Sequence, residues 1–219
     1  MPSPLRIGVL ISGTGTNLQA IIDAIERDKL DAHIQMVVSN RPDAYGLTRA
    51  RNHNLPTSII DHKTFPSREA FDTEVIKTLQ ASDVELVVLA GFMRLFSPLF
   101  IQAFPQRIIN IHPALLPAFP GTHAQRQAIQ HGVRLAGATV HFVDEEMDHG
   151  PIIMQAAVPV YPDDTEESLG ARILAQEHRI YPHVIQLFAE SRIEIRGRSV
   201  IIHNESRSAT AALYAPALS

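Results

Sequence analysis

The sequence predicts an α/β fold with a doubly wound, mostly parallel sheet and mixed C-terminal strands. A near-continuous apolar run, 6–12, is followed at once by a glycine-containing loop and then by apolar residues at helical spacing. Strand and helix patterns then alternate as far as residue 112, as expected of a parallel sheet covered on both faces. Beyond that point, two long strands at 135–143 and 151–160 predict a hairpin or a mixed-sheet pair.

Each element of the N-terminal half follows from its apolar spacing. Short apolar runs predict strands at 6–12, 34–39, 57–60, 86–89 and 107–111. Helical spacing predicts helices over 18–25, 47–53 and 67–81, and another that begins at Pro98. Ser67 is suited to cap the third of these helices, and proline is favoured in the first turn of a helix.

The C-terminal half has fewer and longer elements. A short helix is expected at 124–131, and a long helix follows Asp164 or Thr165 as its cap, with a kink at Pro182. Two short strands, 193–196 and 200–202, are expected to close the edge of the sheet. We expect one domain over 1–205 and a flexible tail over 206–219, where the residues are small and weakly patterned.

Composition excludes several classes of protein. The chain has 219 residues, 45% of them hydrophobic, and a formal net charge of −4, which suits a globular protein without affinity for nucleic acid. The N-terminus lacks a signal-peptide pattern, and no apolar run approaches the roughly 18 residues of a membrane span. The absence of cysteine excludes a disulfide framework and a thiolate zinc site. We therefore expect a cytoplasmic protein.

The loop Gly13-Thr14-Gly15-Thr16-Asn17 is a candidate anion site, because it joins the first strand to the first helix. Backbone N–H groups at such a position point at whatever lies on the helix N-terminus. The dinucleotide fingerprint is incomplete, since Leu18 stands where the third glycine would fall and Asn40 where a ribose-binding acid is expected. We predict a cradle for one phosphate, with a tight turn that binds nothing as the alternative.

The stretch 108–121 begins as a strand and ends in three prolines and a glycine. Asn110 and His112 are two residues apart, so on a strand their side chains leave from the same face. Pro113 holds His112 extended. An amide can donate to a developing oxyanion, and an imidazole can move a proton near neutral pH. We predict a catalytic pair that opens on the same cleft as the glycine loop; a core histidine beside a turn is the alternative.

The acidic loop 144–150 contains one further candidate. Asp144, Glu145 and Glu146 are typical of a solvated turn, whereas Asp148 precedes His149-Gly150-Pro151, whose restricted backbone can fix a carboxylate. A carboxylate beside an imidazole favours its protonated form and holds its orientation.

These residues also allow or exclude two other chemistries. Zinc held by His112, His141 and Asp148 is an alternative, although the short histidine spacings typical of zinc sites are absent. The commonest covalent mechanisms have no nucleophile here, because there is no Gly-x-Ser-x-Gly motif and no cysteine. What remains suits direct transfer of an acyl group to an amine.

The run from Asn110 to Pro117 resembles the Asn-x-His-Pro-Ser-Leu-Leu-Pro signature of the folate-dependent formyltransferases. The stretches that resemble the purine-synthesis branch of this family are 11–21, 39–41, 89–94 and 176–182. The resemblance covers roughly residues 6–182. It implies a formyltransferase fold with a Rossmann-like N-terminal half, which would be a monomer or homodimer. It also implies 10-formyltetrahydrofolate as cosubstrate and 5-phosphoribosylglycinamide as acceptor, with no metal, nucleic acid or membrane.

The resemblance also implies roles for individual positions. The catalytic residues would be Asn110, His112 and Asp148, with Thr139 and His141 lining the site. The ribotide would lie on Gly15, Thr16, Asn17 and Glu177. The folate would contact Arg68, Met93, Arg94, Leu95 and Phe96, with Asp144, Glu145, Glu146 and Met147 around its pterin. The half at about 1–105 would thus bind the ribotide phosphate, and the half at about 106–205 would bind folate and catalyse.

A few positions depart from the family pattern. Ala114 replaces serine, Phe96 stands where leucine is common, and His149 replaces a glycine in the acidic loop, where we expect it to alter loop mobility. By analogy, Leu116-Pro117 is expected to be a cis peptide.

Three other functions are alternatives to the transferase. A 10-formyltetrahydrofolate hydrolase would use the same three catalytic residues with water as acceptor. Such hydrolases usually carry an N-terminal regulatory domain, whereas this chain begins its first strand at about Arg6. A methionyl-tRNA formyltransferase would need a C-terminal RNA-binding domain and positive charge. A non-catalytic nucleotide-binding module is the remaining alternative.

Overall fold

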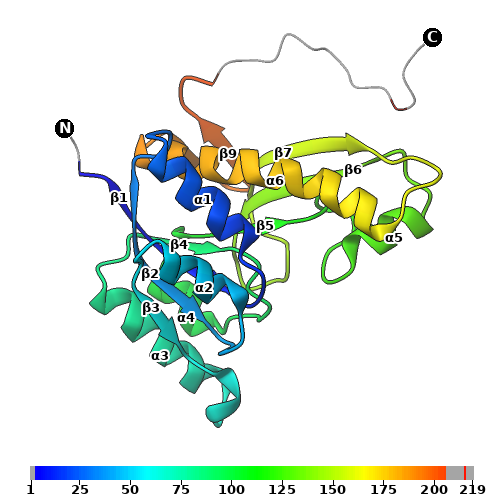
Figure 1. The fold of residues 1–219 in the computed structure, drawn as a ribbon. Coiled ribbons are helices and arrows are strands. Elements are labelled where there is room, and N and C mark those ends of the chain that lie inside the picture. The colour runs from blue at the N-terminus through cyan, green and yellow to red at the C-terminus, as the bar shows by residue number, and fades with distance from the viewer. Residues whose placement is uncertain (1–2, 206–214, 216–219) are drawn as a thin grey trace.

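A seven-stranded sheet forms the centre of the computed structural model, which describes residues 3–205 and Ala215 (Figure 1). The expected tail, 206–219, lies outside the described residues except for Ala215. The strands are β1 (Leu5–Ile11), β2 (Ala32–Ser39), β3 (Thr57–Ile59), β4 (Leu86–Leu89), β5 (Ile108–His112), β6 (Leu135–Phe142) and β7 (Ile152–Pro159). Their order is β3-β2-β1-β4-β5-β6-β7; the first five are parallel, and β6 and β7 run antiparallel to their neighbours. The predicted fold class is confirmed.

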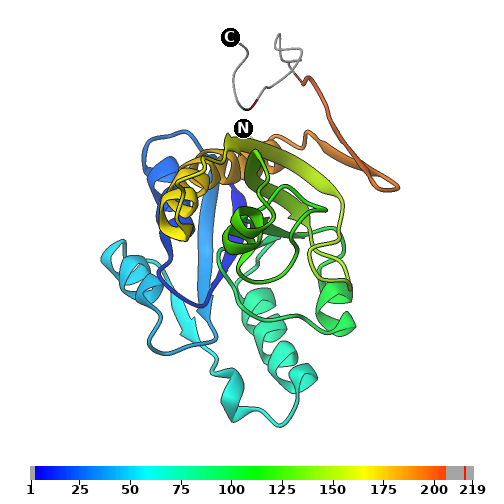
Figure 2. The same ribbon diagram turned by 90° about the vertical axis from the view of Figure 1, so that its right-hand side faces the viewer.

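Helices cover both faces of this sheet (Figures 1 and 2). One face carries α1 (Thr16–Glu26), α2 (Tyr45–Asn52) and the long α6 (Glu166–Ala189), against which the short α5 (Ala124–Gln130) packs. The other face carries α3 (Arg68–Ala81) and α4 (Pro98–Ala103), and a 3-10 turn, His62–Thr64, precedes α3. Alternate strand residues enter the two cores: Val9 of β1 packs on the α6 side and Leu10 on the α3 side.

The helix ends follow the residues that the sequence places there. Ser67 Oγ accepts from the Ala70 N–H at 3.1 Å and caps α3, and Pro98 begins α4. Thr165 and Ser168 form a reciprocal capping box at the start of α6. That helix runs through Pro182 without interruption. Among the described residues, no helix has the length and apolarity to cross a membrane.

The last two strands do not close the edge of the main sheet, so that prediction was wrong. β8 (Ile193–Arg196) and β9 (Ser199–Ile202) pair with each other in a separate two-stranded sheet. The reason is local: Gly197, at φ 61°, and Arg198 form a two-residue turn that folds the hairpin back on itself. Each strand thereby finds its hydrogen-bond partners in the other, and β7 keeps the edge position.

Candidate active site

A polar patch interrupts the apolar sheet where β5 and β6 run side by side. Asn110 pairs with His141 across the two strands, and His112 pairs with Thr139. All four side chains leave from one face, because the residues between them, such as Ile111 and Val140, enter the core under α6. The loop 113–121 accepts hydrogen bonds from His112 and Thr139, and Asp148 of the loop 143–151 lies 3.4 Å from His112 Nδ1 and 3.8 Å from His141 Nε2. A buried sheet end is thus lined with polar groups.

His112 is held in one orientation and one tautomer. Its Nε2 lies 2.9 Å from the Phe119 carbonyl oxygen, and because a carbonyl only accepts, Nε2 carries a hydrogen. Nδ1 is therefore the ring nitrogen that faces the carboxylate, and it lies 3.4 Å from Asp148 Oδ2. Only 5% of the His112 side chain and 11% of the Asp148 side chain are exposed. The Gly121 N–H donates to Asp148 Oδ2 at 2.7 Å and fixes the carboxylate.

Asn110 is fixed as a hydrogen-bond donor by its neighbour. His141 Nδ1 lies 2.7 Å from the Phe142 carbonyl oxygen, and because a carbonyl only accepts, Nδ1 carries the ring hydrogen. Burial lowers the pKa of His141, although the Phe142 carbonyl and the charge of Asp148 act in the opposite direction. The neutral ring offers the lone pair of Nε2 to Asn110 Nδ2 at 3.2 Å. The second N–H of this amide is then available for a substrate oxygen.

Thr139 holds the backbone that follows β5. Its fully buried hydroxyl donates to the Ala114 carbonyl at 2.6 Å and accepts from the Leu116 N–H and from Gln155 Nε2, each at 3.0 Å. The peptide between Leu116 and Pro117 is cis, as the resemblance implied. The structure thus places Thr139 beneath the loop that carries the Phe119 carbonyl, where it supports His112 through the backbone.

The glycine loop lies close to a second loop and to α6. A Cβ on Gly15, which has φ 71°, would lie 2.6 Å from the Gly46 backbone, so this position requires glycine. The N-terminus of α1 has no side-chain cap, which leaves its first N–H groups available. Asn17 Nδ2 donates to Glu177 Oε2 at 2.7 Å, and burial raises the pKa of Glu177. Gly15, Thr16, Asn17 and Glu177 are thereby brought together.

The predicted folate residues divide between exposed and buried positions. Met93, Leu95 and Met147 are 72%, 56% and 52% exposed, so their apolar side chains are accessible to a ligand. Phe96 is instead buried, with its ring stacked on Phe100 at 3.7 Å between centroids. Any folate contact at Phe96 would therefore come from its backbone.

The loop that carries these residues is anchored to α3. Asp72 Oδ2 accepts from both the N–H and the hydroxyl of Ser97 at 2.6 Å, and Arg94 lies over the Phe71 ring at 5.4 Å. Arg68 is exposed one helical turn before Asp72, at the start of the same helix. On the acidic loop, the Glu146 N–H donates to Asp144 Oδ1 at 3.1 Å, and the Glu145 and Glu146 side chains face outward.

Sequence reasoning missed the residue that ties the acidic loop to the C-terminal hairpin. Arg198, in the β8–β9 turn, donates through Nη2 to the His149 carbonyl at 2.6 Å and through Nη1 to the His149 ring, with Nε2 at 3.1 Å. His149 Nδ1 lies 3.0 Å from Asp144 Oδ2. Gln155 and Arg49 were missed as well. No sequence pattern signals such partners, because each lies far along the chain from the loop it contacts.

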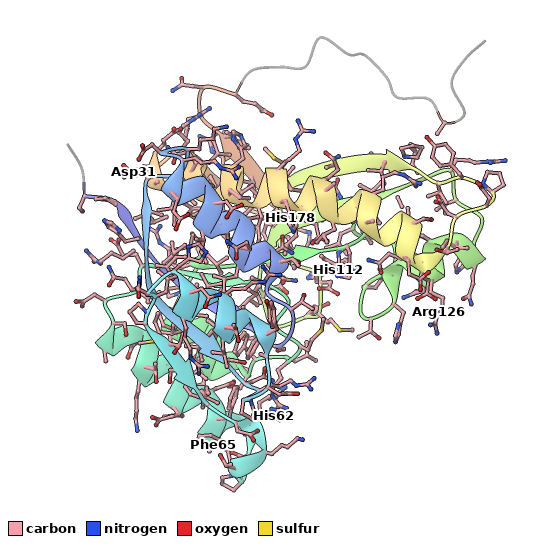
Figure 3. All side chains as sticks on the ribbon, in the orientation of Figure 1. Asp31, His62, Phe65, His112, Arg126 and His178 are labelled. Carbon is pink, nitrogen blue, oxygen red and sulfur yellow. The ribbon has the colours of Figure 1, made fainter. Side chains whose placement is uncertain are left out.

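A cavity of about 680 Å³ follows the seam between α1 and α6. Its walls include Thr16 of the glycine loop, Arg49 of α2 and His178 of α6. Figure 3 labels His178 on α6 and His112 at the end of β5, near the centre of the molecule, while His62 and Phe65 lie near α3.

Within residues 3–205, no group of three His, Cys, Asp or Glu side chains is arranged to hold a metal ion.

Known proteins resemble this chain over most of its length. Residues 5–185 match the family described as formyl transferase. Phosphoribosylglycinamide formyltransferase of Escherichia coli is 48% identical over 191 residues, 87% of this chain and 90% of that protein. The trifunctional purine biosynthetic protein adenosine-3 of Drosophila melanogaster is 49% identical over 83% of this chain, which spans 14% of that protein. The crystal structure of glycinamide ribonucleotide transformylase 1 from Symbiobacterium toebii superposes with a TM-score of 0.91 at 55% identity, covering 93% of this chain and 96% of that one.

Proposed function

The chain belongs to the formyl transferase family, and we propose that it transfers the formyl group of 10-formyltetrahydrofolate to the amine of 5-phosphoribosylglycinamide in purine biosynthesis. The observation that carries the chemistry is the buried His112–Asp148 pair, 3.4 Å apart, beside an Asn110 amide with one N–H available. Asn110, His112 and Asp148 are the proposed catalytic residues.

In the proposed reaction each of these groups has one role. The glycinamide amine attacks the formyl carbon, a C–N bond forms, and the carbonyl oxygen becomes an oxyanion. The free N–H of Asn110 and the protonated Nδ1 of His112 donate to that oxygen, and Asp148 stabilises the imidazolium. The proton leaving the attacking nitrogen passes by way of the Asp148 carboxylate to the folate nitrogen, whose bond to the formyl carbon then breaks.

Substrate binding uses two ends of the cleft in this proposal. Gly15, Thr16 and Asn17 receive the ribotide phosphate on backbone N–H groups, and Glu177 accepts from the ribose hydroxyls. The exposed Met93, Leu95 and Met147 cover the apolar parts of the folate, together with the backbone of Arg94 and Phe96. Arg68 and the acidic loop complete the folate site. We also place the reaction in the cytoplasm, in a monomer or homodimer without metal.

An absorbance assay for loss of the formyl group from a 10-formylfolate analogue tests this proposal. The assay is run in metal-free buffer with and without phosphoribosylglycinamide. Release that requires the ribotide is the expected result. Release with water alone would identify a hydrolase, and no release under either condition would leave a nucleotide-binding module without this activity.

A further inference from the structure

Ser12 lies between the two proposed substrate sites and has no part in the proposed mechanism. It follows β1 directly, precedes the glycine loop 13–17 and is only 4% exposed. Its N–H donates to the Gly91 carbonyl at 3.2 Å, and its hydroxyl accepts from the Met93 N–H at 2.8 Å. Both partners belong to residues 91–97, the folate segment, which carries several of the residues proposed for the folate. One residue therefore joins the start of the glycine loop to the folate segment.

The hydroxyl of Ser12 takes the place of a backbone partner at the end of two strands. β1 and β4 pair as parallel strands, and just past the end of β4 the Ala90 N–H still donates to the Leu10 carbonyl at 2.9 Å. The chain then turns at Gly91, which has φ 75°. Beyond this turn the acceptor of the Met93 N–H is Ser12 Oγ rather than a strand carbonyl. Because a backbone N–H needs an acceptor, this contact holds the start of the folate segment.

Asn40 sets the direction of this hydroxyl. Ser12 Oγ donates its hydrogen to Asn40 Oδ1 at 2.6 Å, and Asn40 is only 2% exposed. A hydroxyl that donates to one neighbour keeps its lone pairs for others, so the contact with Asn40 leaves Oγ to accept from Met93. Asn40 follows β2, at the position where a dinucleotide fold places its ribose-binding acid. In this chain its amide oxygen instead accepts from a side chain of the protein.

The other end of the folate segment is held by a second buried side chain. Asp72 of α3 accepts from both the N–H and the hydroxyl of Ser97. Residues 94–96 thus lie between two anchors, Ser12 at Met93 and Asp72 at Ser97. The backbone groups proposed to meet the folate depend on both anchors for their position.

We propose that Ser12, oriented by Asn40, is a positioning residue for the folate, although it borders the loop proposed for the ribotide. This inference rests on the proposed function. Among the described residues, the hydroxyl of Ser12 forms hydrogen bonds only with Met93 and Asn40, so its loss should weaken folate binding and leave ribotide binding unchanged. The contact with Met93 is present before and during the reaction, so its loss changes KM rather than kcat.

The test compares Ser12→Ala with Ser39→Ala, a control that removes another buried serine hydroxyl, at the end of the neighbouring strand β2. The Ser39 hydroxyl bonds only with the backbone of Arg41. For Ser12→Ala, KM for the 10-formylfolate analogue should rise about three- to tenfold, the usual effect of one hydrogen bond between neutral groups. Its kcat and its KM for the ribotide should stay within about twofold, as should all three values for Ser39→Ala. Ser12→Thr keeps the hydroxyl and should recover most of the loss.

Asn40→Ala tests the inference from the other side and remains informative where Ser12→Ala does not fold. It should raise KM for the folate analogue by less than Ser12→Ala does, because the Met93 N–H keeps an acceptor that is no longer oriented. The double variant should be no worse than Ser12→Ala, since Asn40 acts through Ser12. An additive loss would overturn the part that Asn40 has in the inference.

Calorimetric titration with the folate analogue in the absence of ribotide does not depend on formyl transfer. Ser12→Ala should bind the analogue about three- to tenfold more weakly than the wild type, and Ser39→Ala should bind it equally well. Hydrogen exchange of the Met93 amide should be faster in Ser12→Ala and unchanged in Ser39→Ala.

Two results would overturn the inference: a folded Ser12→Ala with unchanged KM and affinity for the folate analogue, or an equal rise in KM for the analogue and for the ribotide. A wild type that binds the analogue without transferring its formyl group to the ribotide would contradict the proposed function alone, and the titration would still decide the role of Ser12. A wild type that does not bind the analogue would overturn both.

Discussion

Replacing Thr139 with valine tests whether one hydroxyl holds the loop that orients His112. The change preserves the shape of the side chain, which is fully buried. It removes the acceptor of the Leu116 N–H and the donor to the Ala114 carbonyl. The separate hydrogen bond from Gln155 Nε2 to the Leu116 carbonyl, 2.9 Å long, is retained. Two buried backbone groups are thus left without these partners.

The expected loss of stability can be worked out from those two groups. Each buried group without a hydrogen bond costs about 1–3 kcal/mol. The added methyl group returns about 0.8 kcal/mol by burial. The free energy of unfolding should therefore fall by about 1–5 kcal/mol. The value of kcat should fall with it, because the loop carries the carbonyl that fixes His112 Nε2.

Urea unfolding followed by circular dichroism measures the change, with activity assayed on the same samples. Thr78→Val on α3 is the control, because the Thr78 hydroxyl donates only to the Glu74 carbonyl in its own helix, and its effect should be within about 0.5 kcal/mol. If Thr139→Val is no more destabilising than Thr78→Val, the hydroxyl does not hold the loop and the reasoning fails.

Three further predictions concern Glu177, His141 and Arg198. Burial raises the pKa of the Glu177 carboxyl, so this group loses its proton at a lower pH in the unfolded chain than in the native one. The free energy of unfolding of the wild type, relative to that of Glu177→Gln, should therefore fall as the pH rises above about 4.5. A difference in urea unfolding that does not change with pH would contradict this. At pH 6.5 the ¹⁵N NMR signals of His141 should be those of the neutral Nδ1–H ring, and a mostly protonated ring would refute the assignment. Arg198→Ala should speed hydrogen exchange of residues 144–150 and raise KM for the folate, with stability almost unchanged, whereas unaltered exchange would show that Arg198 does not restrain the loop.

Apolar patterning was sufficient to predict the sheet, and local rules were sufficient for the helix ends. Strand 86–89 was predicted at its observed bounds because four buried residues lie between turn residues. Ser67 and Pro98 act through neighbours within four residues, so capping rules find them. The hairpin at 193–202 was assigned to the wrong sheet, because the pattern of a strand does not specify the strand that pairs with it.

The candidate site was predicted only in part, for the same reason. Side chains alternate between the two faces of a strand, so the sequence alone places Asn110 and His112, two residues apart, on one face. The acceptor of His112 Nε2 is the carbonyl of Phe119, a backbone group with no side-chain signature. Arg198 meets His149 from 49 residues away, and Arg49 meets Thr14 from 35 residues away. Partners of this kind depend on the assembled fold.

In the proposed mechanism the His112–Asp148 pair carries the catalysis, and Asp148→Asn tests its role most directly. Asparagine keeps the size of the side chain and an oxygen for the Gly121 N–H but removes the charge beside Nδ1. Asp83→Asn is the matched control, since Asp83 is an exposed aspartate with φ 52°, close to the φ 53° of Asp148. We expect kcat for ribotide-dependent formyl transfer to fall about 10²–10⁴-fold in Asp148→Asn and to change little in Asp83→Asn, with both variants folded. A folded Asp148→Asn enzyme with near-normal kcat would contradict the account.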